Sequence, residues 1–172
     1  LLAAALGDKL ASSVVVDNRP GAGGQIAADL VARSPADGYT LLFANSGMLA
    51  INPWIYKLHS DPATAFAPVS LFSDLPFVLV VPTGLPAKNV AELVTLARAE
   101  PGKHKFASSG TGGAPHLSAE IFQQATGVDL MHVPYKGGGP AMTDLMAGRV
   151  DMLFASVLET MPYVTGLSLI HI

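Results

Sequence analysis

The chain has 172 residues, of which 50% are hydrophobic and only 13% are charged, and its formal net charge is -3 at pH 7. Ten Lys and Arg residues cannot supply the basic surface that nucleic acids require, so we expect no nucleic-acid partner. The absence of cysteine excludes disulfides, thiolate metal sites and cysteine nucleophiles. Apolar runs such as "PFVLVV" have the length of a strand, well short of the roughly 18 residues that a membrane span requires.

The first half predicts a strand, a glycine-rich turn, a helix and a second strand. Residues 1–10 are expected to form an amphipathic helix rather than a signal peptide, because they lack a basic start and a clean cleavage pattern. The segments "VVVDN" (14–18) and "YTLLFA" (39–44) are predicted strands on either side of a helix that starts at Gln25. This order is typical of a crossover in a parallel sheet. Residues 45–76 show no sustained period, and "FVLVVP" (77–82) is a further apolar strand.

The second half predicts a regular alternation of strands and helices. Asn89 is the expected N-cap of a helix whose apolar residues recur at helical spacing from Val90 to Ala97. Strands at 105–108, 128–133 and 149–156 then alternate with helices at 115–125 and 140–147. The fold class is therefore α/β, and we place a domain boundary after residue 82, with a first lobe at 1–82 and a second at 83–172.

Two glycine-rich loops each follow a predicted strand and open a helix: "FASSGTGGAPHLSAEIF" (106–122) and "MHVPYKGGGPAMTDLM" (131–146). Such loops lie where α/β sheets bind ligands, since unpaired N–H groups and the helix dipole attract anions there. The sequence lacks the P-loop, the dinucleotide fingerprint and the nucleophile elbow, and few basic residues flank the loops. A carboxylate is thus favoured over a phosphate. The alternative is that both loops are only tight turns.

Several polar and aromatic residues are candidates for more than one role. His116 either donates to a carboxylate, acts as a base or caps local carbonyls, whereas His132 on its strand is expected to be structural. Lys136 either pairs with an acidic ligand or is solvated. The loop after residue 44 contains Asn45, Ser46 and Asn52, which either donate hydrogen bonds to a ligand or form turns. Trp54 and Tyr56 either line a cleft or pack in the core. The histidines lack metal-ligand spacing, so we predict no metal site and no other cofactor.

A wider set of segments resembles the Bug family, the periplasmic solute-binding receptors of tripartite tricarboxylate transporters (TctC-like proteins). They include "VVVDNRPGAGGQIAADLVARSPADGYTLLFANSG", "INPWIY", "FAPVSLF", "PFVLVVP" and "HVPYKGGGPAMTDLMAGRVDMLF", together with the first glycine loop, in the order expected for the family. The resemblance runs from about residue 8 to residue 164. It implies a two-lobe, Venus-flytrap periplasmic-binding-protein fold that holds a carboxylate between its lobes through main-chain amides, hydroxyls and waters.

The resemblance also nominates ligand-binding residues. The segments "SSGTGG" and "YKGGGPA" match second-lobe ligand loops, and "NSGMLAIN" matches a first-lobe loop. The nominated positions are Ser46, Gly47, Asn52, Ser109, Gly110, Thr111, Gly112, His116, Gly137, Gly138, Gly139 and Ala141.

The family pattern extends further than this sequence at both ends. It includes a strand and a glycine-rich ligand loop ahead of residue 1, and it continues after "MPYVTG" into a basic strand and a return through the first lobe. Residues 167–172, "LSLIHI", depart from that pattern. We therefore expect a first lobe that is incomplete and an export signal that lies outside the sequence.

The function that the resemblance implies is a monomeric, non-enzymatic periplasmic receptor that captures a small organic acid and delivers it to membrane permease subunits. Lobe closure would hinge near residues 82–86. One alternative is an α/β enzyme for acyl or carboxylate substrates, with Ser109 or Thr111 as nucleophile and His116 as base. Another is a domain that senses acids for a signalling partner.

Overall fold

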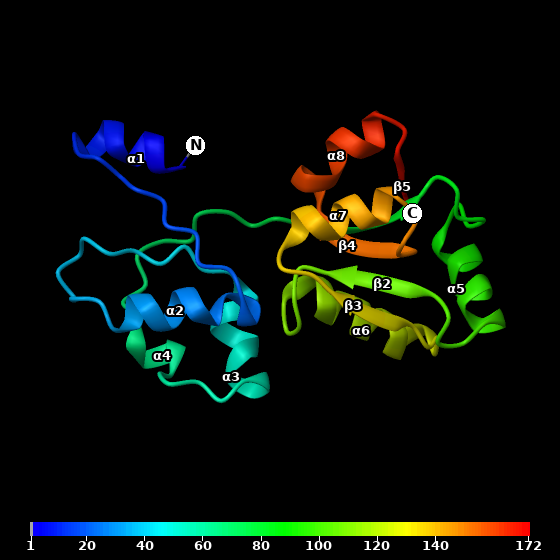
Figure 1. Cartoon of the computed structure of the whole chain (residues 1–172), viewed down its shortest axis with the longest axis horizontal. Helices are drawn as coiled ribbons and strands as arrows, with labels where there is room; N and C mark the ends of the chain where they lie inside the picture. The colour runs from blue at the N-terminus through cyan, green and yellow to red at the C-terminus, as the bar shows by residue number, and fades with distance from the viewer. Residues whose placement is uncertain (1) are drawn as a thin grey trace.

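The structure is a computed structural model that describes residues 2–172, and it has two parts (Figure 1). One part contains short helices joined by long loops, and the other contains a sheet covered by helices on both faces. The first part comprises α1 (Leu2–Leu10), η1 (Ala22–Gly24), α2 (Gln25–Ala32), η2 (Gly47–Ile51), α3 (Asn52–Ile55) and α4 (Pro62–Ala65). The second comprises β1 (Phe77–Pro82), α5 (Val90–Ala99), β2 (Lys105–Ser108), α6 (Ala114–Thr126), β3 (Met131–Pro134), α7 (Gly138–Met146), β4 (Met152–Ser156), α8 (Val157–Thr165) and β5 (Leu169–His171).

The five strands form one mixed sheet in the order β3-β2-β4-β1-β5. Strand β2 runs parallel to β3 and β4, with Phe106 opposite both His132 and Met152. Strand β1 is antiparallel to β4 and β5. The carboxyl ends of β2, β3 and β4 therefore meet at one edge of the sheet, and β1 starts at the same edge, where Phe77 pairs with Ser156.

Both faces of the sheet are covered around the central strands β1 and β4, which explains why these two strands are almost continuously apolar. Successive side chains point to opposite faces, so Phe106 and Ala107, or Met152 and Leu153, belong to different apolar clusters. Helices α5 and α6 complete one cluster, in which the side chain of Leu93 from α5 is fully buried. The other is completed by α7 and by side chains of α8.

The second half confirms the sequence predictions closely. Each predicted helix and strand is present with small shifts at its ends, and Asn89 caps α5 by accepting a hydrogen bond from the Glu92 N–H at 2.9 Å. None of the helices within residues 2–172 has both the length and the apolar character needed to cross a membrane.

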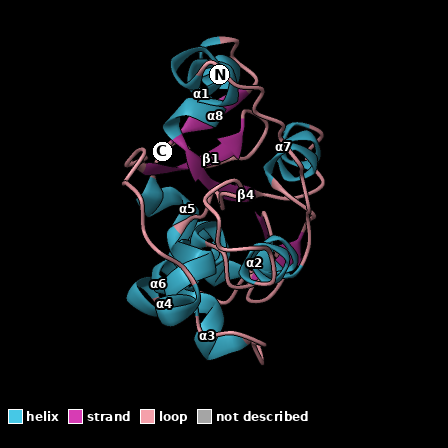
Figure 2. Cartoon of the chain, turned by 90° about the vertical axis from the view of Figure 1, so that its left-hand side faces the viewer, coloured by secondary structure: helices cyan, strands magenta, loops and turns pink. Residues whose placement is uncertain are grey.

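The two strands predicted in the first half are absent, and both predictions are wrong. Residues 14–18 and 39–44 have no regular structure, and Figure 2 shows no strand in this part of the chain. Val15 is 84% exposed and Phe43 is 68% exposed. β-branched and aromatic composition favours a strand only where another strand satisfies its backbone groups, and no partner pairs with these segments within residues 2–172.

Strand β1 bears on the predicted domain boundary. Residues 77–82 were assigned to the first lobe, but β1 pairs with β4 and β5 inside the sheet of the second part. The Val157 N–H also donates to the Pro76 carbonyl at 3.1 Å, at the point where the chain enters the sheet. This pairing favours a boundary before Phe77, while the division into two lobes stays a prediction.

Replacement of Leu93 by Ala should destabilise the sheet part by about 2–5 kcal/mol, because it leaves a cavity between α5 and the sheet. Urea denaturation followed by circular dichroism measures this loss. The control is Val90→Ala on the same helix, where the side chain is 41% exposed and the loss should stay within about 1 kcal/mol. Equal losses in the two variants would contradict the assigned core.

Candidate functional site

The two glycine loops lie side by side at the carboxyl edge of the sheet. The Tyr135 N–H donates to the Ser108 carbonyl at 2.9 Å, and the Gly137 N–H donates to the Ser109 carbonyl at 3.3 Å. The parallel pairing of β2 with β3 continues in these two bonds beyond the strands. The structure thus brings together the nominated residues of the two loops, 109–112 and 137–139.

Most amides of the first glycine loop are already hydrogen-bonded within it. The Gly110 N–H donates to Ser108 Oγ at 3.2 Å, the Gly112 N–H to His116 Nδ1 at 3.3 Å, and the Gly113 N–H to the Gly110 carbonyl at 3.3 Å. The sequence had suggested that such amides are free to hold an acid. An acid bound here has to use the remaining donors or replace these internal bonds.

Residues of the first part pack directly on this loop at a contact that we call the lobe junction, formed by Gly23, Gly47, Asn52 and Tyr56 against residues 109–113. The Tyr56 hydroxyl donates to the Thr111 carbonyl at 2.9 Å. A Cβ atom placed on Gly47 would lie 3.3 Å from the Gly112 carbonyl oxygen and 3.3 Å from Gly113 Cα. The two main chains approach this closely because Gly47 has no side chain.

Asn52 lies at the centre of the junction and is fully buried. Its Nδ2 donates to the Gly23 carbonyl at 3.1 Å and to Gln25 Oε1 at 3.5 Å, and Gln25 Nε2 donates to Asp29 Oδ1 at 3.0 Å. Asn52 Oδ1 has no hydrogen-bond partner within residues 2–172. It lies 3.3 Å from the position of a Cβ atom on Gly112, so it faces the second lobe.

The second glycine loop faces a carboxylate of the protein itself. A Cβ atom on Gly138, the first residue of α7, would lie 3.0 Å from Glu159 Oε1. Glu159 is held there by a capping box at the start of α8, in which the Ser156 hydroxyl donates to Glu159 Oε2 at 3.0 Å and accepts from the Glu159 N–H at 3.3 Å. The positive end of the α7 dipole thus already faces a negative charge.

Two further nominated residues, Ala141 and Ser46, lie in different surroundings, and so does Lys136, which directly precedes the nominated glycines of the second loop. Ala141 is fully buried in the core beneath α7, so its side chain does not reach the edge of the sheet. Lys136 is exposed and forms no ion pair in the part of the chain that the structure describes. Ser46 directly precedes η2, beside Gly47.

Two histidines stack beneath the first loop. The rings of His116 and His132 have centroids 4.1 Å apart, and Phe106 stacks on His132 at 4.7 Å. His132 Nε2 lies 2.6 Å from the hydroxyl of the buried Ser108. Burial, with the nearby His116 as a second cause, lowers the pKa of His132 from 6.5 to about 4, so its ring is neutral at pH 7.

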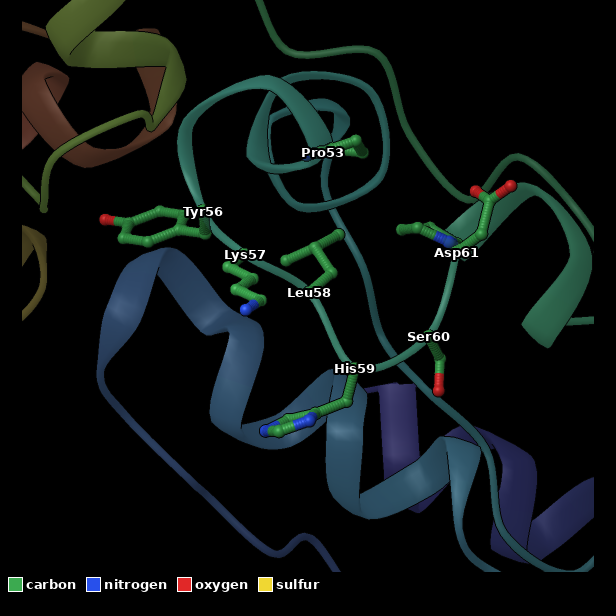
Figure 3. Close-up of a pocket in the computed structure, with 8 residues that line it drawn as sticks. Pro53, Tyr56, Lys57, Leu58, His59, Ser60 and Asp61 are labelled. Atoms are coloured by element: carbon green, nitrogen blue, oxygen red, sulfur yellow. The ribbon is translucent and has the colours of Figure 1, made fainter.

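A shallow surface hollow of about 380 Å³ lies next to the junction, in the segment from Pro53 to Pro62 (Figure 3). The Tyr56 ring points out of this hollow toward the second lobe, whereas Lys57 and His59 extend toward the first-part helices. Of the residues around the hollow, Tyr56 alone belongs to the lobe junction. The hydrogen bonds and close contacts of the junction, rather than the hollow, define the candidate site.

Several site residues were missed by sequence reasoning. Ser156 and Glu159 form an S-x-x-E capping box that the sequence displays plainly. Ser108 is not among the nominated residues, although it directly precedes Ser109. The contact between Gln25 and Asn52 joins residues 27 positions apart, and the sequence carries no signal for it.

Comparison with known proteins places these features in a family. The family model described as "Tripartite tricarboxylate transporter family receptor" matches residues 1–169. Among solved structures, R. palustris Rpa4515 with adipate is 38% identical with a TM-score of 0.96, covering 99% of this chain and 57% of that one. The periplasmic binding protein BugD is 32% identical with a TM-score of 0.90, covering 99% and 57%. MatC (Rpa3494) from Rhodopseudomonas palustris with bound malate is 26% identical with a TM-score of 0.93, covering 99% and 58%.

The match covers only part of the length of each relative. The chain spans about half the length of the curated relatives it matches, 45% and 50% for two of them.

The thermal stability of the chain should fall as the pH is lowered from about 6.5 to 4. Over this window the unfolded state takes up a proton on His132 that the folded state resists, and above it both states are neutral. His116 from α6 and Ser108 from β2 face the His132 ring. In His132→Gln the slope of the melting temperature against pH should flatten. The exposed His59→Gln should keep the original slope, and an unchanged slope in His132→Gln would contradict the assignment.

If a carboxylate binds beside the second loop, as the sequence predicts, replacement of Glu159 by Gln should raise its affinity by about twofold at low salt, because a negative charge beside this loop is removed. Gln can still accept the Ser156 hydrogen bond. Isothermal titration at two ionic strengths measures the gain, which should vanish in high salt. Glu100→Gln, at the end of α5, makes the same change in net charge and should have no effect; a gain in both variants would argue against a local role.

Proposed function

The chain belongs to the Bug (TctC-like) family of tripartite tricarboxylate transporter receptors, and we propose that it captures a small organic acid between its two lobes for delivery to membrane permease subunits. The observation that carries this proposal is the lobe junction. Two parts of the chain meet there through glycine backbones, at the edge of the sheet where α/β proteins bind ligands. A contact made by bare main chain on both sides suits a surface that opens and closes around a ligand.

The ligand class follows from the donors that surround the junction. The hydroxyls of Ser109 and Thr111 and the first N–H groups of α6 and α7 all lie at the carboxyl edge of the sheet. Such donors suit a carboxylate without a dedicated cation. Solved relatives hold adipate and malate, which are both carboxylates, and this supports the same class of ligand here. The proposed ligand residues are those nominated from the sequence, with Ala141 contributing through its backbone alone.

We propose that the protein binds its ligand without catalysing a reaction. In the alternative, His116 activates Ser109 or Thr111, but His116 Nδ1 instead accepts the Gly112 N–H. The serine that contacts a histidine is Ser108, which pairs with His132 and is fully buried. A buried hydroxyl cannot attack a substrate in the cleft, so the geometry favours binding over catalysis.

The cellular setting is proposed from the family. Receptors of this kind act in the periplasm, and we propose the same location and a monomeric state for this protein. Transport and acid sensing would use the same cleft. They differ in the protein that recognises the closed form.

The test is a calorimetric screen of mono-, di- and tricarboxylates on the wild type and on Gly47→Val. At least one acid should bind the wild type. The variant should bind it roughly tenfold or more weakly, because overpacking the junction costs about 1–3 kcal/mol. Ala91→Val is the control, because it adds a branched side chain at an exposed position of α5, away from both the junction and the proposed hinge.

Two outcomes would contradict the proposal. No binding of any acid would end it, and unchanged affinity in Gly47→Val would remove the junction from the site. If NMR detects chemical conversion of the bound acid, this result would favour the enzyme alternative.

A further inference from the structure

The junction offers hydrogen-bond acceptors rather than donors. Asn52 Oδ1 is buried without a partner, and a Cβ atom on Gly23 would lie 3.1 Å from it and 3.3 Å from the Thr111 carbonyl oxygen. Two carbonyl-type oxygens therefore border the bare side of Gly23. The Thr111 carbonyl oxygen already accepts from the Tyr56 hydroxyl, so Asn52 Oδ1 is the oxygen of the two that lacks a donor.

The orientation of the Asn52 amide is fixed by a chain of hydrogen bonds that ends on a carboxylate. Asp29 is an acceptor only, so Gln25 must turn its Nε2 toward it and present Oε1 to Asn52. Asn52 then donates from Nδ2 to Gln25 and to the Gly23 carbonyl. A flipped Asn52 amide would set its oxygen against both of these acceptors. The oxygen is thus held toward the second lobe.

We propose that Asn52 Oδ1 accepts a hydrogen bond from a hydroxyl group of the ligand, so that the receptor prefers hydroxy acids to the same acids without the hydroxyl. This inference rests on the proposed function and deepens it. A carboxylate cannot satisfy Asn52 Oδ1, because both groups are acceptors. In the facing loop the amides of Gly110, Gly112 and Gly113 donate to partners inside the loop, so they do not supply the missing donor.

A hydroxyl fits this position better than an ammonium group. No carboxylate contacts Asn52 Oδ1 in the described part of the chain, and Asp29 is separated from it by Gln25. An ammonium group would be desolvated there against neutral oxygens only, which is costly for a full charge. A hydroxyl carries no such cost and supplies the single donor that is missing.

The experiment measures acid pairs that differ by one hydroxyl: L-malate against succinate, and citrate against tricarballylate. Calorimetry on the wild type should give a preference of about tenfold for the hydroxy acid of each pair that binds. In Asn52→Leu, which keeps the size of the side chain but lacks the acceptor, the two affinities should come within about threefold. Asn89→Leu makes the same change at the cap of α5 in the other lobe and should keep the preference.

A second variant covers the case in which Asn52→Leu fails to fold. Asp29→Leu leaves Asn52 in place but frees Gln25, so the Asn52 amide can turn. The ratio of the two affinities should fall toward one, while a merely structural role of Asp29 would lower both affinities and leave their ratio unchanged.

Each remaining outcome overturns the inference. Equal affinities within each pair for the wild type, with an equal loss in Asn52→Leu, would assign the position to a water molecule. Tighter binding of L-aspartate than of L-malate would assign it to an ammonium group. If acids bind without any hydroxyl preference, this inference alone fails, whereas the absence of binding by every acid would end the proposed function with it.

Discussion

The parallel pairing of β2 with β3 and β4 is the constraint on which the site depends. It brings three strand ends to one edge of the sheet, where β4 leads directly into α8 and β2 and β3 lead through the glycine loops into α6 and α7. The two glycine loops and the capping box at Ser156 are therefore neighbours in space although they lie apart in the sequence. The apolar clusters on both faces keep this edge rigid, since the strands are packed on either side.

Polar groups are sorted across the candidate site. Where the first part of the chain meets the first glycine loop, the oxygens of Asn52 and Thr111 are acceptors, whereas the helix starts and hydroxyls of the two glycine loops are donors. A ligand that carries both a carboxylate and a hydroxyl matches this division, because its two groups have opposite requirements. Glu159 limits how much negative charge the second loop tolerates.

The sequence predicted the helices and strands of the sheet part well because their signals are local. The central strands β1 and β4 are almost continuously apolar, and α5 has a recognisable start at Asn89. The strands at 14–18 and 39–44 failed for the opposite reason, since composition does not reveal whether a partner strand is present. The glycine loops could also be located, but not the hydrogen bonds of their amides. Those depend on Ser108 and His116 folding back onto the loop, which is a tertiary arrangement.

The unpartnered oxygen of Asn52 has an energetic consequence for lobe movement. If the lobes part, water reaches this oxygen, and if they meet without a ligand, it is left buried and unpaired. An unsatisfied buried acceptor costs about 1–3 kcal/mol, which favours the parted state by roughly 5- to 150-fold. A ligand hydroxyl removes that cost, so closure and recognition are coupled through one atom. If Asn52 contacts a ligand hydroxyl as proposed, the same atom would also disfavour closure of the empty protein.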